Sequence, residues 1–549
     1  MKTPELGIVV IAAGKGTRMR SALPKELHEI CGRPLIGHVL AVADALDAAY
    51  TVLVLSEEKL GPVSSAFGPR YAYAVQREQL GTGHAVMQAA PAVPRPTDDV
   101  LVLYGDTPLL RPATARAVVE LRRAPSQIAP FYRTANWARV FDFLADRRGV
   151  VLTDQQREAV QMALTNKVSV LTGGPGTGKT TTLRTIIMAL QQRGDAFLLA
   201  SPTGRAAKRL SEATGAEAAT IHRLLEFSPM GGPHFKRNAE MPLEASVVVI
   251  DEVSMLDILL ANNLLKAIPQ HAHVLLVGDA DQLPSVGPGR VLRDILDSMA
   301  VPSIHLDTIF RQAEGSGIIT NAHRINSGEF PHTRDLADFF FFPRPEPEPC
   351  AELTVELVAE RIPRRFGLNP RRDIQVLTPT HRGPAGVANL NTLLQEALNP
   401  PHAHKPEQRF GATIFRLGDR VLQLRNNYDL EVYNGDIGEI AAIDAVEQLL
   451  TVRFDDTRDV AYDFGLLDEL TLAYAISVHK SQGAEYACVV LPLLTQHFTL
   501  LQRNLVYTAV TRAKQLAVLT GDRRAIAIAV KNNRVAERYT GLARRLKGL

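Results

Sequence analysis

A chain of 549 residues with 46% hydrophobic and 22% charged residues has the composition of a globular protein and the length of about two to four domains. The formal net charge of +3 permits nucleic acid as a partner but does not require it. Cys31, Cys350 and Cys488 are too far apart for a disulfide framework or a zinc motif, so a cytoplasmic location is expected. No apolar run approaches the ~20 residues that cross a membrane, so no membrane partner is expected.

Strand-like and helical patterns alternate over the first 120 residues. Apolar runs at 7–13, 51–56, 71–75 and 99–106 read as strands, and helical patterns follow Pro34, Gly83 and Pro112. This alternation predicts a parallel sheet with helices on its faces. The loop AAGKGTRM follows the first run, where backbone N–H groups can converge on an anion. A tight turn without a ligand is an equally good interpretation of the loop alone.

Four segments of this region together resemble the start of the uridyltransferase domain of GlmU-type N-acetylglucosamine-1-phosphate uridyltransferases. They are GKGTRM, LPKELHEICGRPLIGHVL, VQREQLGTGHAVMQA and VLYGDTPLL, within residues 6–122. The resemblance implies a nucleotide on Ala13, Gly14 and Gly16, with Arg18 and Lys25 near its phosphates. It places the uracil ring against Gln76, Gln79, Gly81 and Thr82, and makes Asp106 a Mg²⁺ ligand. The family's sugar site and second metal ligand have no counterpart here, so we expect a catalytically incomplete, vestigial domain.

Residues 123–149 match neither nucleotide-binding unit. Their first part is linker-like, and apolar spacing from Phe131 predicts one short amphipathic helix. The only tryptophan, Trp137, is expected to pack against the domain that follows.

Residues 168–187 have every feature of a P-loop: an apolar strand, a glycine-rich loop ending in Gly-Lys-Thr, and a helical pattern. The glycines let amide groups point inward around phosphates, and the helix N-terminus adds its dipole. Lys179 is placed for the β- and γ-phosphates of ATP, and Thr180 for Mg²⁺. The expected nucleotide-binding residues are Gly173, Gly174, Pro175, Gly176, Thr177, Gly178, Lys179, Thr180 and Thr181.

An acidic motif further along the chain also indicates an NTPase. The apolar run before Asp251 and Glu252 reads as a buried strand with two carboxylates at its end. An aspartate there can hold Mg²⁺, and the adjacent glutamate can orient or deprotonate the attacking water. Gln156, in the segment before the P-loop, is suited to the edge of an adenine base.

Further motifs in fixed order resemble those of superfamily 1 DNA helicases, most closely the RecD-like branch, over residues 152–522. They occupy 152–160, 200–210, 220–225, 275–289, 309–328, 472–486 and 505–514. The resemblance implies two RecA-like lobes with ATP between them, and it assigns Gln282, Arg311 and Arg512 to the γ-phosphate. It also implies single-stranded and tailed duplex DNA as partners, and translocation from 5′ to 3′. The expected DNA contacts are Thr203, Arg205, Thr220, His222, Thr378, Thr380, His479 and Ser481.

The expected fold is therefore α/β. Two RecA-like lobes, at 150–344 and 345–549, follow a partial Rossmann-like nucleotidyltransferase sheet at 1–122. A small SH3-like β-barrel insertion is expected at about 410–468. Residues 226–244 are equally compatible with a pin that splits the duplex and with a surface loop, and the basic tail after Arg523 with a DNA contact or a solvated helix. The alternative function is a sugar-nucleotide transferase with an attached motor.

Overall fold

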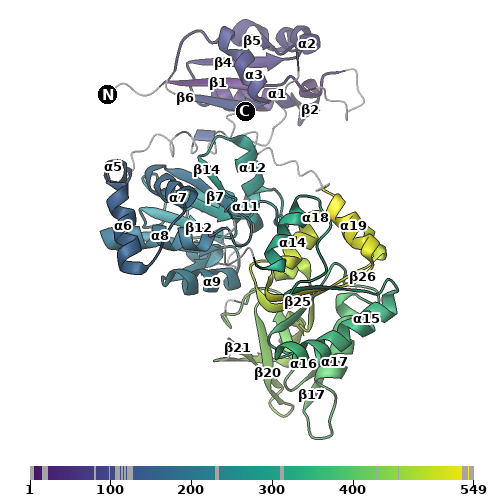
Figure 1. The fold of residues 1–549 in the computed structure, drawn as a ribbon. Helices are drawn as coiled ribbons and strands as arrows, with labels where there is room; N and C mark the ends of the chain where they lie inside the picture. The colour runs from purple at the N-terminus through teal and green to yellow at the C-terminus, as the bar shows by residue number, and fades with distance from the viewer. Residues whose placement is uncertain are drawn as a thin grey trace.

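The protein is described by a computed structural model with side chains. It covers residues 5–14, 23–78, 82–97, 99–105, 112, 115–116, 119, 128–228, 234–308, 315–427, 429–455, 457–533 and 542. Figure 1 shows three bodies along the chain: a small front sheet, a first lobe and a second lobe that carries an antiparallel insertion. In the described part of the chain, no helix is both long and apolar enough to cross a bilayer.

The front sheet has the strand order β5-β4-β1-β6, and every neighbouring pair is parallel. Its central strand β1 (Leu6–Ile11) is buried along its whole length. The other strands are β4 (Tyr50–Leu55), β5 (Ala72–Val75) and β6 (Asp99–Tyr104). Helix α1 (Leu35–Asp44) and helix α2 (Glu57–Phe67) cover one face, and α3 (Thr82–Ala89) covers the other. The predicted parallel sheet is confirmed.

The first lobe is a six-stranded parallel sheet in the order β14-β7-β13-β12-β8-β9. Its strands are β7 (Val168–Gly173), β8 (Phe197–Ser201), β9 (Ala218–Thr220), β12 (Val247–Ile250), β13 (His273–Gly278) and β14 (Ser303–Leu306). One face carries α7 (Asp154–Thr165), α8 (Lys179–Arg193) and α9 (Gly204–Thr214). The other face carries α10 (Ile221–Leu224), α11 (Ile258–Ala267) and α12 (Val291–Ser298). Alternate strand residues feed the two cores: Leu171 faces one and Val170 the other.

The joint before this lobe folds as part of it. It forms two helices, α5 (Ala129–Arg133) and α6 (Trp137–Arg148), where the sequence predicted one. The interruption has a local cause, because the side chain of Asn136 accepts from the backbone N–H of Arg139 and begins a new helix. Tyr132 is 3% exposed in the first-lobe core, and Trp137 packs against that core as expected.

The second lobe is a parallel sheet in the order β15-β26-β25-β16-β24. Its strands are β15 (Phe339–Pro343), β16 (Ile374–Thr378), β24 (Ala475–Ser477), β25 (Tyr486–Leu493) and β26 (Ala513–Gly521). Helices α14 (Gly317–Asn326), α18 (Arg503–Val510) and α19 (Arg523–Lys531) pack into one core of this lobe. On the opposite core lie α15 (Pro347–Glu356) and α17 (Val387–Leu398).

The change from the first lobe to the second therefore lies between β14 and α14, and the predicted boundary at 344/345 falls too late. The apolar run at 339–343 was taken for a crossing because prolines follow it, yet it pairs with β26 as an edge strand of the second sheet. An edge position tolerates Pro343, which cannot donate a ladder hydrogen bond.

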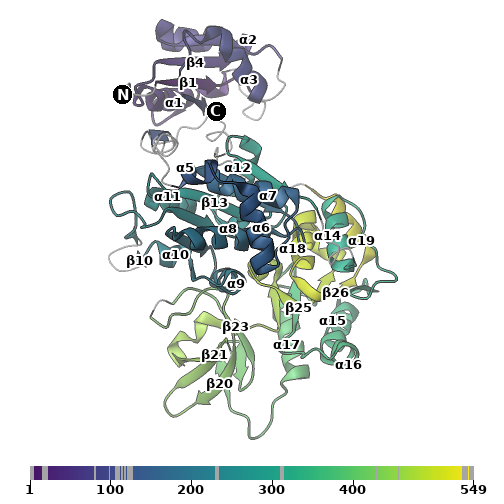
Figure 2. The ribbon, with the colours of Figure 1, turned by 60° about the vertical axis from the view of Figure 1, so that its left-hand side comes forward.

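The predicted insertion forms a five-stranded antiparallel sheet in the order β22-β21-β20-β19-β23. Its strands are β19 (Arg420–Gln423), β20 (Ile437–Asp444), β21 (Leu449–Phe454), β22 (Arg458–Asp463) and β23 (Leu470–Leu472). A hairpin of β17 (Glu407–Phe410) and β18 (Thr413–Arg416) precedes it. Figure 2 shows this sheet below α9 of the first lobe, and Lys208 of α9 forms an ion pair with Asp455 of the insertion at 2.6 Å.

Candidate nucleotide site between two lobes

The P-loop leaves β7 at Gly173 and ends where α8 begins at Lys179. Gly176 and Gly178 have φ values of 73° and 84°, in the left-handed region that favours glycine. At Gly173, with φ of 154°, a Cβ atom would lie 2.6 Å from the carbonyl oxygen of Leu306. The loop can therefore keep this path only with glycine at these positions.

Lys179 is the first residue of α8, and its side chain lies within the P-loop. Its Nζ donates to the carbonyl oxygens of Gly173 at 2.5 Å and Gly174 at 2.8 Å. The ammonium and the N-terminus of α8 therefore place positive charge at the mouth of the loop. This arrangement suits a polyphosphate, whose oxygens can replace the two carbonyls as partners of Lys179.

The acidic pair follows β12, two strands away from the P-loop strand in the sheet. Burial raises the pKa of Asp251 to about 6, and the neighbouring charge of Glu252 adds to the rise. The backbone N–H of Glu252 donates to Asp251 at 2.8 Å, and the charges of Arg209 and Lys179 act in the opposite direction on that pKa. The charge of Lys179 acts on Asp251, and the Asp251 carboxylate and the Thr180 hydroxyl at the start of α8 are oxygen groups of the kind that Mg²⁺ prefers.

Arginine from the second lobe reaches this acidic pair. Arg512, which follows α18, is only 3% exposed, and its Nη1 lies 4.0 Å from Oε1 of Glu252 in the first lobe. The same nitrogen donates to the carbonyl oxygen of Ala484 at 3.2 Å, while Nε has no partner. The predicted γ-phosphate residue Arg512 therefore faces the predicted catalytic carboxylate across the interface of the lobes.

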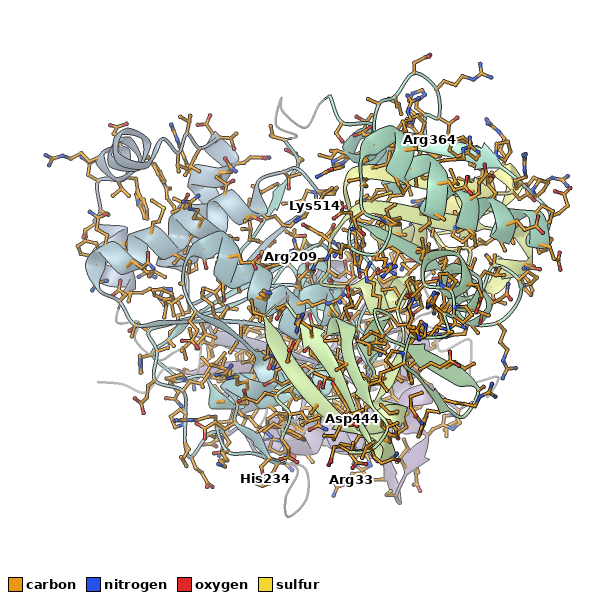
Figure 3. The ribbon with its side chains drawn as sticks, turned by 90° about the horizontal axis from the view of Figure 1, so that it is seen from below. Arg33, Arg209, His234, Arg364, Asp444 and Lys514 are labelled. Carbon is orange, nitrogen blue, oxygen red and sulfur yellow. The ribbon has the colours of Figure 1, made fainter. Side chains whose placement is uncertain are left out.

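A second charged cluster links the lobes beside this contact. Arg209 of α9 lies 3.8 Å from Glu252 and also forms an ion pair with Glu485 of the second lobe. Lys514 of β26 binds the other oxygen of Glu485 at 3.2 Å. Figure 3 shows Arg209 and Lys514 at the junction of the two lobes. Sequence reasoning did not identify Arg209 or Glu485.

The loop after β13 is held by the second lobe through hydrogen bonds that the sequence did not predict. The hydroxyl of Tyr507 donates to Asp279 at 2.8 Å, and Oγ1 of Thr508 accepts from the backbone N–H of Leu283 at 2.8 Å. The side chain of Gln482 donates to the carbonyl oxygen of Leu283 at 2.7 Å. Burial raises the pKa of Asp279, and the hydrogen bond from Tyr507 opposes that rise. Asp279 follows a buried strand just as Asp251 does, and this shared pattern is the signal in the sequence by which Asp279 could have been identified.

Gln282 and Gln156 both have partners within the protein. Gln282 donates to Asp279 at 3.1 Å, and its Oε1 is buried without a partner. Gln156 is fully buried: its Oε1 accepts from the N–H of Thr153 in a capping box, and its Nε2 donates to the carbonyl oxygen of Gly178. In this conformation Gln156 supports the P-loop and has no surface to offer an adenine base. Arg311 lies outside the described residues.

His323 is a further group beside the P-loop. A Cβ atom at Gly174 would lie 3.2 Å from Cε1 of His323 and 3.1 Å from the hydroxyl oxygen of Tyr507. His323 belongs to α14, so both side chains come from the second lobe. Gly174 therefore lets two side chains of the second lobe approach the phosphate loop closely.

The predicted DNA contacts divide into two groups. Thr378 and Ser481 are fully buried, and their hydroxyls donate to the carbonyl oxygens of Ala385 and Val478. The prediction that these two side chains contact DNA is therefore corrected. Thr220 is 8% exposed and caps α10. Thr203 caps α9.

The other predicted contacts are more accessible. Arg205 donates to the hydroxyl of Tyr486 at 3.1 Å, and His222 stacks edge-on against Phe227, with its pKa lowered by burial. Thr380 is accessible beside Arg382. His479 lies on a short helix at 478–481. Of the region at 226–244, residues 229–233 lie outside the described residues, and the rest contains a short hairpin of β10 (Phe227–Ser228) and β11 (His234–Phe235).

In the front sheet, the loop after β1 lies beside a buried ion pair. Lys59 donates to Glu26 at 2.9 Å, and also to the carbonyl oxygens of Ala12 and Gly14. A Cβ atom at Gly14 would lie 3.5 Å from Nζ of Lys25, so the predicted phosphate residues Gly14 and Lys25 are neighbours. Of the other predicted residues, Gly16, Arg18, Gln79, Gly81 and Asp106 lie outside the described residues.

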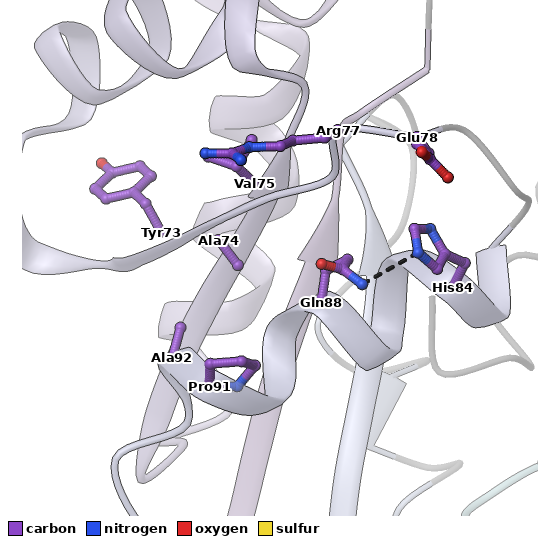
Figure 4. A pocket seen from close by; sticks show the side chains of 9 residues that line it. All are labelled: Tyr73, Ala74, Val75, Arg77, Glu78, His84, Gln88, Pro91 and Ala92. Atoms are coloured by element: carbon purple, nitrogen blue, oxygen red, sulfur yellow. Dashed lines mark hydrogen bonds between the residues drawn. The ribbon is translucent and has the colours of Figure 1, made fainter.

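A cavity of about 710 Å³ opens beside β5 and α3 of the front sheet (Figure 4). Gln76, one of the predicted uracil residues, contacts Nδ1 of His84 at 3.2 Å, while Gln88 contacts Nε2 of the same ring, and both His84 and Gln88 line the cavity. Thr82 begins α3 next to this wall. The cavity adjoins the predicted base site, but the described residues hold only half of that site.

Fold and geometry together define a P-loop NTPase built from two RecA-like lobes. Comparisons with known proteins give the family. Residues 156–288 match the model for an AAA domain, 390–454 the SH3 domain of ATP-dependent RecD-like DNA helicases, and 472–520 the UvrD-like helicase C-terminal domain. The RecD subunit of the RecBCD enzyme from Mycobacterium tuberculosis is 32% identical over 431 residues, which are 72% of this chain and 73% of that subunit. The chain belongs to the RecD-like family of superfamily 1.

The ATP-dependent RecD2 DNA helicase of Deinococcus radiodurans is 37% identical over 396 residues, which cover 72% of this chain and 52% of that relative. The chain thus spans about half the length of that helicase. The front domain is a separate match: residues 8–148 fit the model of a MobA-like NTP transferase domain. The bifunctional protein GlmU of Alcanivorax borkumensis is 52% identical over 114 residues, 21% of this chain and 25% of GlmU. The match to 148 includes α5 and α6, although both pack on the first lobe.

Replacement of Asp251 by asparagine is expected to stabilise the fold at pH 7 in the absence of magnesium, by about 1–3 kcal/mol. The folded-state pKa of about 6 lies above the ordinary value of 3.8, so folding disfavours the ionised form. That penalty is present above pH 6 and disappears as the pH falls through 6 toward 4. Urea denaturation of Asp251→Asn and wild type at pH 7 and at pH 4 measures the difference.

The exposed Asp142 provides a matched control, since Asp142→Asn should change stability by less than about 0.5 kcal/mol at either pH. Equal stabilisation by Asp251→Asn at both pH values, or destabilisation at pH 7, would contradict a raised pKa for Asp251. Magnesium with ATP should raise the stability of the wild type but not that of Asp251→Asn.

Proposed function

We propose that this chain is a DNA-dependent ATPase and a 5′–3′ DNA helicase. The observation that carries the proposal is the approach of Arg512, from the second lobe, to the acidic pair beside the P-loop of the first lobe. A guanidinium delivered across a cleft can stabilise charge on a transferring phosphoryl group only when the cleft is closed. Membership of the RecD-like family supports the same function.

In the proposed hydrolysis, Lys179 leaves the loop carbonyls for the β- and γ-phosphates, and Glu252 orients the attacking water. Magnesium, held by Thr180 and Asp251, would offset the charge on the phosphate oxygens. Arg512 exchanges Glu252 for the γ-phosphate, and Arg311 is proposed as a second arginine there. Gln282 reports the γ-phosphate through Asp279 to Tyr507 in the second lobe.

Loss of the γ-phosphate removes the partner that Arg512 and Gln282 share, so the cleft opens. Repeated closing and opening would move two DNA grips past each other. We propose that Thr203, Arg205 and His222 form part of the grip on the first lobe, and Thr380 and His479 part of the grip on the second. Such grips bind the DNA backbone with little sequence preference.

The front domain is proposed to be catalytically incomplete. It retains the loop at Gly14 with Lys25 beside it, which supports binding of a nucleotide phosphate. Its likeness to GlmU covers only 25% of that protein, so a whole sugar-nucleotide site is not expected. Sugar-nucleotide transfer is the second candidate function, because the family match to the front domain favours it.

Hydrolysis of ATP should rise at least about tenfold with single-stranded DNA and fall by at least about 100-fold in Lys179→Ala, because the lysine neutralises the phosphates. A coupled assay of ADP release measures both effects. The exposed Lys266 on α11 is a control with the same change of charge, and Lys266→Ala should hydrolyse ATP like the wild type. Turnover that ignores DNA would count against the helicase assignment.

A duplex with a 5′ single-stranded tail should be unwound, while duplexes with a 3′ tail or blunt ends should not. Strand separation on labelled duplexes with equal duplex sequence measures activity and direction together. Preference for the 3′ tail would reverse the proposed direction, and hydrolysis without any strand separation would reduce the protein to a DNA-dependent ATPase.

The front domain should form no detectable UDP-N-acetylglucosamine from UTP and N-acetylglucosamine 1-phosphate, because half of the family's site is missing. Chromatography of the reaction detects the product. Product that forms in the wild type and is lost in Asp106→Ala would establish the second function instead.

A further inference from the structure

A cavity of about 350 Å³ lies between the two lobes, separate from the P-loop residues. The first lobe contributes Ser254, the loop after β13 and the start of α12 to its wall. The second lobe contributes Asn326 at the end of α14 and the start of α18. Figure 1 labels α14 and α18 where the lobes meet and α12 higher up on the first lobe. Of the residues that line this cavity, Gln282 is also proposed for the γ-phosphate, and the others have no role in the nucleotide site or among the expected DNA contacts.

The wall of the cavity has an excess of positive charge. Among the described residues that line it are Arg290, Arg293 and Arg503 and one carboxylate, Asp281, while Arg293 also lies 3.2 Å from Asp297. Asp281 already has partners, because Asn326 donates to it at 2.7 Å and Arg293 lies 3.9 Å away. Among the described residues, the side chain of Arg503 donates to the carbonyl oxygens of Val530 and Asn326. Within the described part of the chain, neither Arg290 nor Arg503 has a carboxylate partner.

Buried polar atoms without hydrogen-bond partners converge on the same cavity. They are Oγ of Ser254, Oε1 of Gln282, Nε of Arg290 and Oδ1 of Asn504. Ser254 is only 8% exposed, so its hydroxyl has no alternative in bulk water. Buried polar atoms in native proteins almost always have partners, and a group of them around one cavity indicates a ligand or ordered water there.

Two helices begin at this cavity. Arg290 and Gln502 precede α12 and α18, and neither supplies a side-chain cap to its helix. The first backbone N–H groups of a helix have no partner within the helix, and the helix dipole gives that end partial positive charge. At α18 the backbone N–H of Arg503 donates to the carbonyl oxygen of Asn532 at 2.9 Å, so the N-terminus of α12, together with Arg290 and Arg503, forms the environment suited to an anion.

We propose that this cavity binds a phosphate group. Arg290 and the N-terminus of α12 hold it from the first lobe, and Arg503 and Asn504 hold it from the second. An oxyanion has acceptors for the guanidinium donors of Arg290 and Arg503 and for the side-chain amide N–H groups of Asn504. The acceptor oxygens of Gln282 and Asn504 are left to ordered water. Because both lobes bind the same anion, occupancy stabilises their closed arrangement. Gln282 connects the cavity to the nucleotide site through Asp279.

The same chemistry is available from inorganic phosphate and from the backbone of DNA. The inorganic source is independent of the proposed helicase activity, whereas the DNA source rests on it. A saturating non-hydrolysable ATP analogue with magnesium keeps the P-loop and the γ-phosphate position filled, so that an added phosphate reports on the cavity. Arg290→Ala removes a donor, and Asn504→Asp places negative charge in the cavity without a change of shape. Arg361→Ala, on the opposite side of the second-lobe sheet, is a control with the same loss of charge as Arg290→Ala.

The first arm measures the thermal midpoint with inorganic phosphate against sodium chloride at equal ionic strength. If free phosphate is the ligand, phosphate raises the midpoint of the wild type and of Arg361→Ala, and the rise is lost in Arg290→Ala and Asn504→Asp. The second arm measures the affinity for a thymidine oligonucleotide of about 16 residues across a salt series.

If DNA phosphate is the ligand, Arg290→Ala weakens binding by about tenfold and reduces the slope of log affinity against log salt by about 0.7. Arg361→Ala leaves both quantities unchanged. The proposal is overturned if both probes act on Arg290→Ala and Asn504→Asp as they act on the wild type. Failure of the wild type to bind DNA would defeat the helicase assignment, and the phosphate arm would then decide the cavity alone.

Discussion

The approach of Arg512 to Glu252 across the interface is the contact on which the rest of the account depends. A buried guanidinium is costly unless it has partners, and among the residues that the structure describes one carboxylate, at 4.0 Å, and one carbonyl oxygen face it. Its Nε has no partner. Arg512 therefore retains hydrogen-bonding capacity at the site where a γ-phosphate would arrive, and a ligand can complete what the protein alone leaves unsatisfied.

This contact is kept in place by its neighbours on α18 and by the loop after β13. Tyr507 and Thr508 precede Arg512 by a few residues and bind Asp279 and Leu283 of the first lobe. Movement of the second lobe must therefore move the arginine and the loop that carries Gln282 together. We propose that closure of the lobes and assembly of the nucleotide site are one event, which is what coupling of hydrolysis to movement requires.

The sequence predicted the P-loop, the acidic strand end and the antiparallel insertion because each depends on local pattern: an apolar strand, glycine positions, and alternation of residues. It was less successful where burial is decided by distant parts of the chain. Thr378 and Ser481 match helicase motifs, yet their hydroxyls bind backbone carbonyls in the core. The lobe boundary was misplaced because no local pattern shows that the strand at 339–343 pairs with one about 180 residues later. Asp279 and Tyr507 were not predicted because their role depends on a hydrogen bond between the two lobes, which no local pattern shows.

The most direct test of the account is the effect of Arg512→Ala on turnover and on nucleotide affinity, with DNA present. We predict that kcat falls by about 10³, that ATP affinity changes by less than about tenfold, and that Arg512→Lys restores little of the rate, because an ammonium cannot make the two-pronged contact. An undiminished kcat in Arg512→Ala would contradict it, since the arginine would then have no part in the chemistry between the lobes.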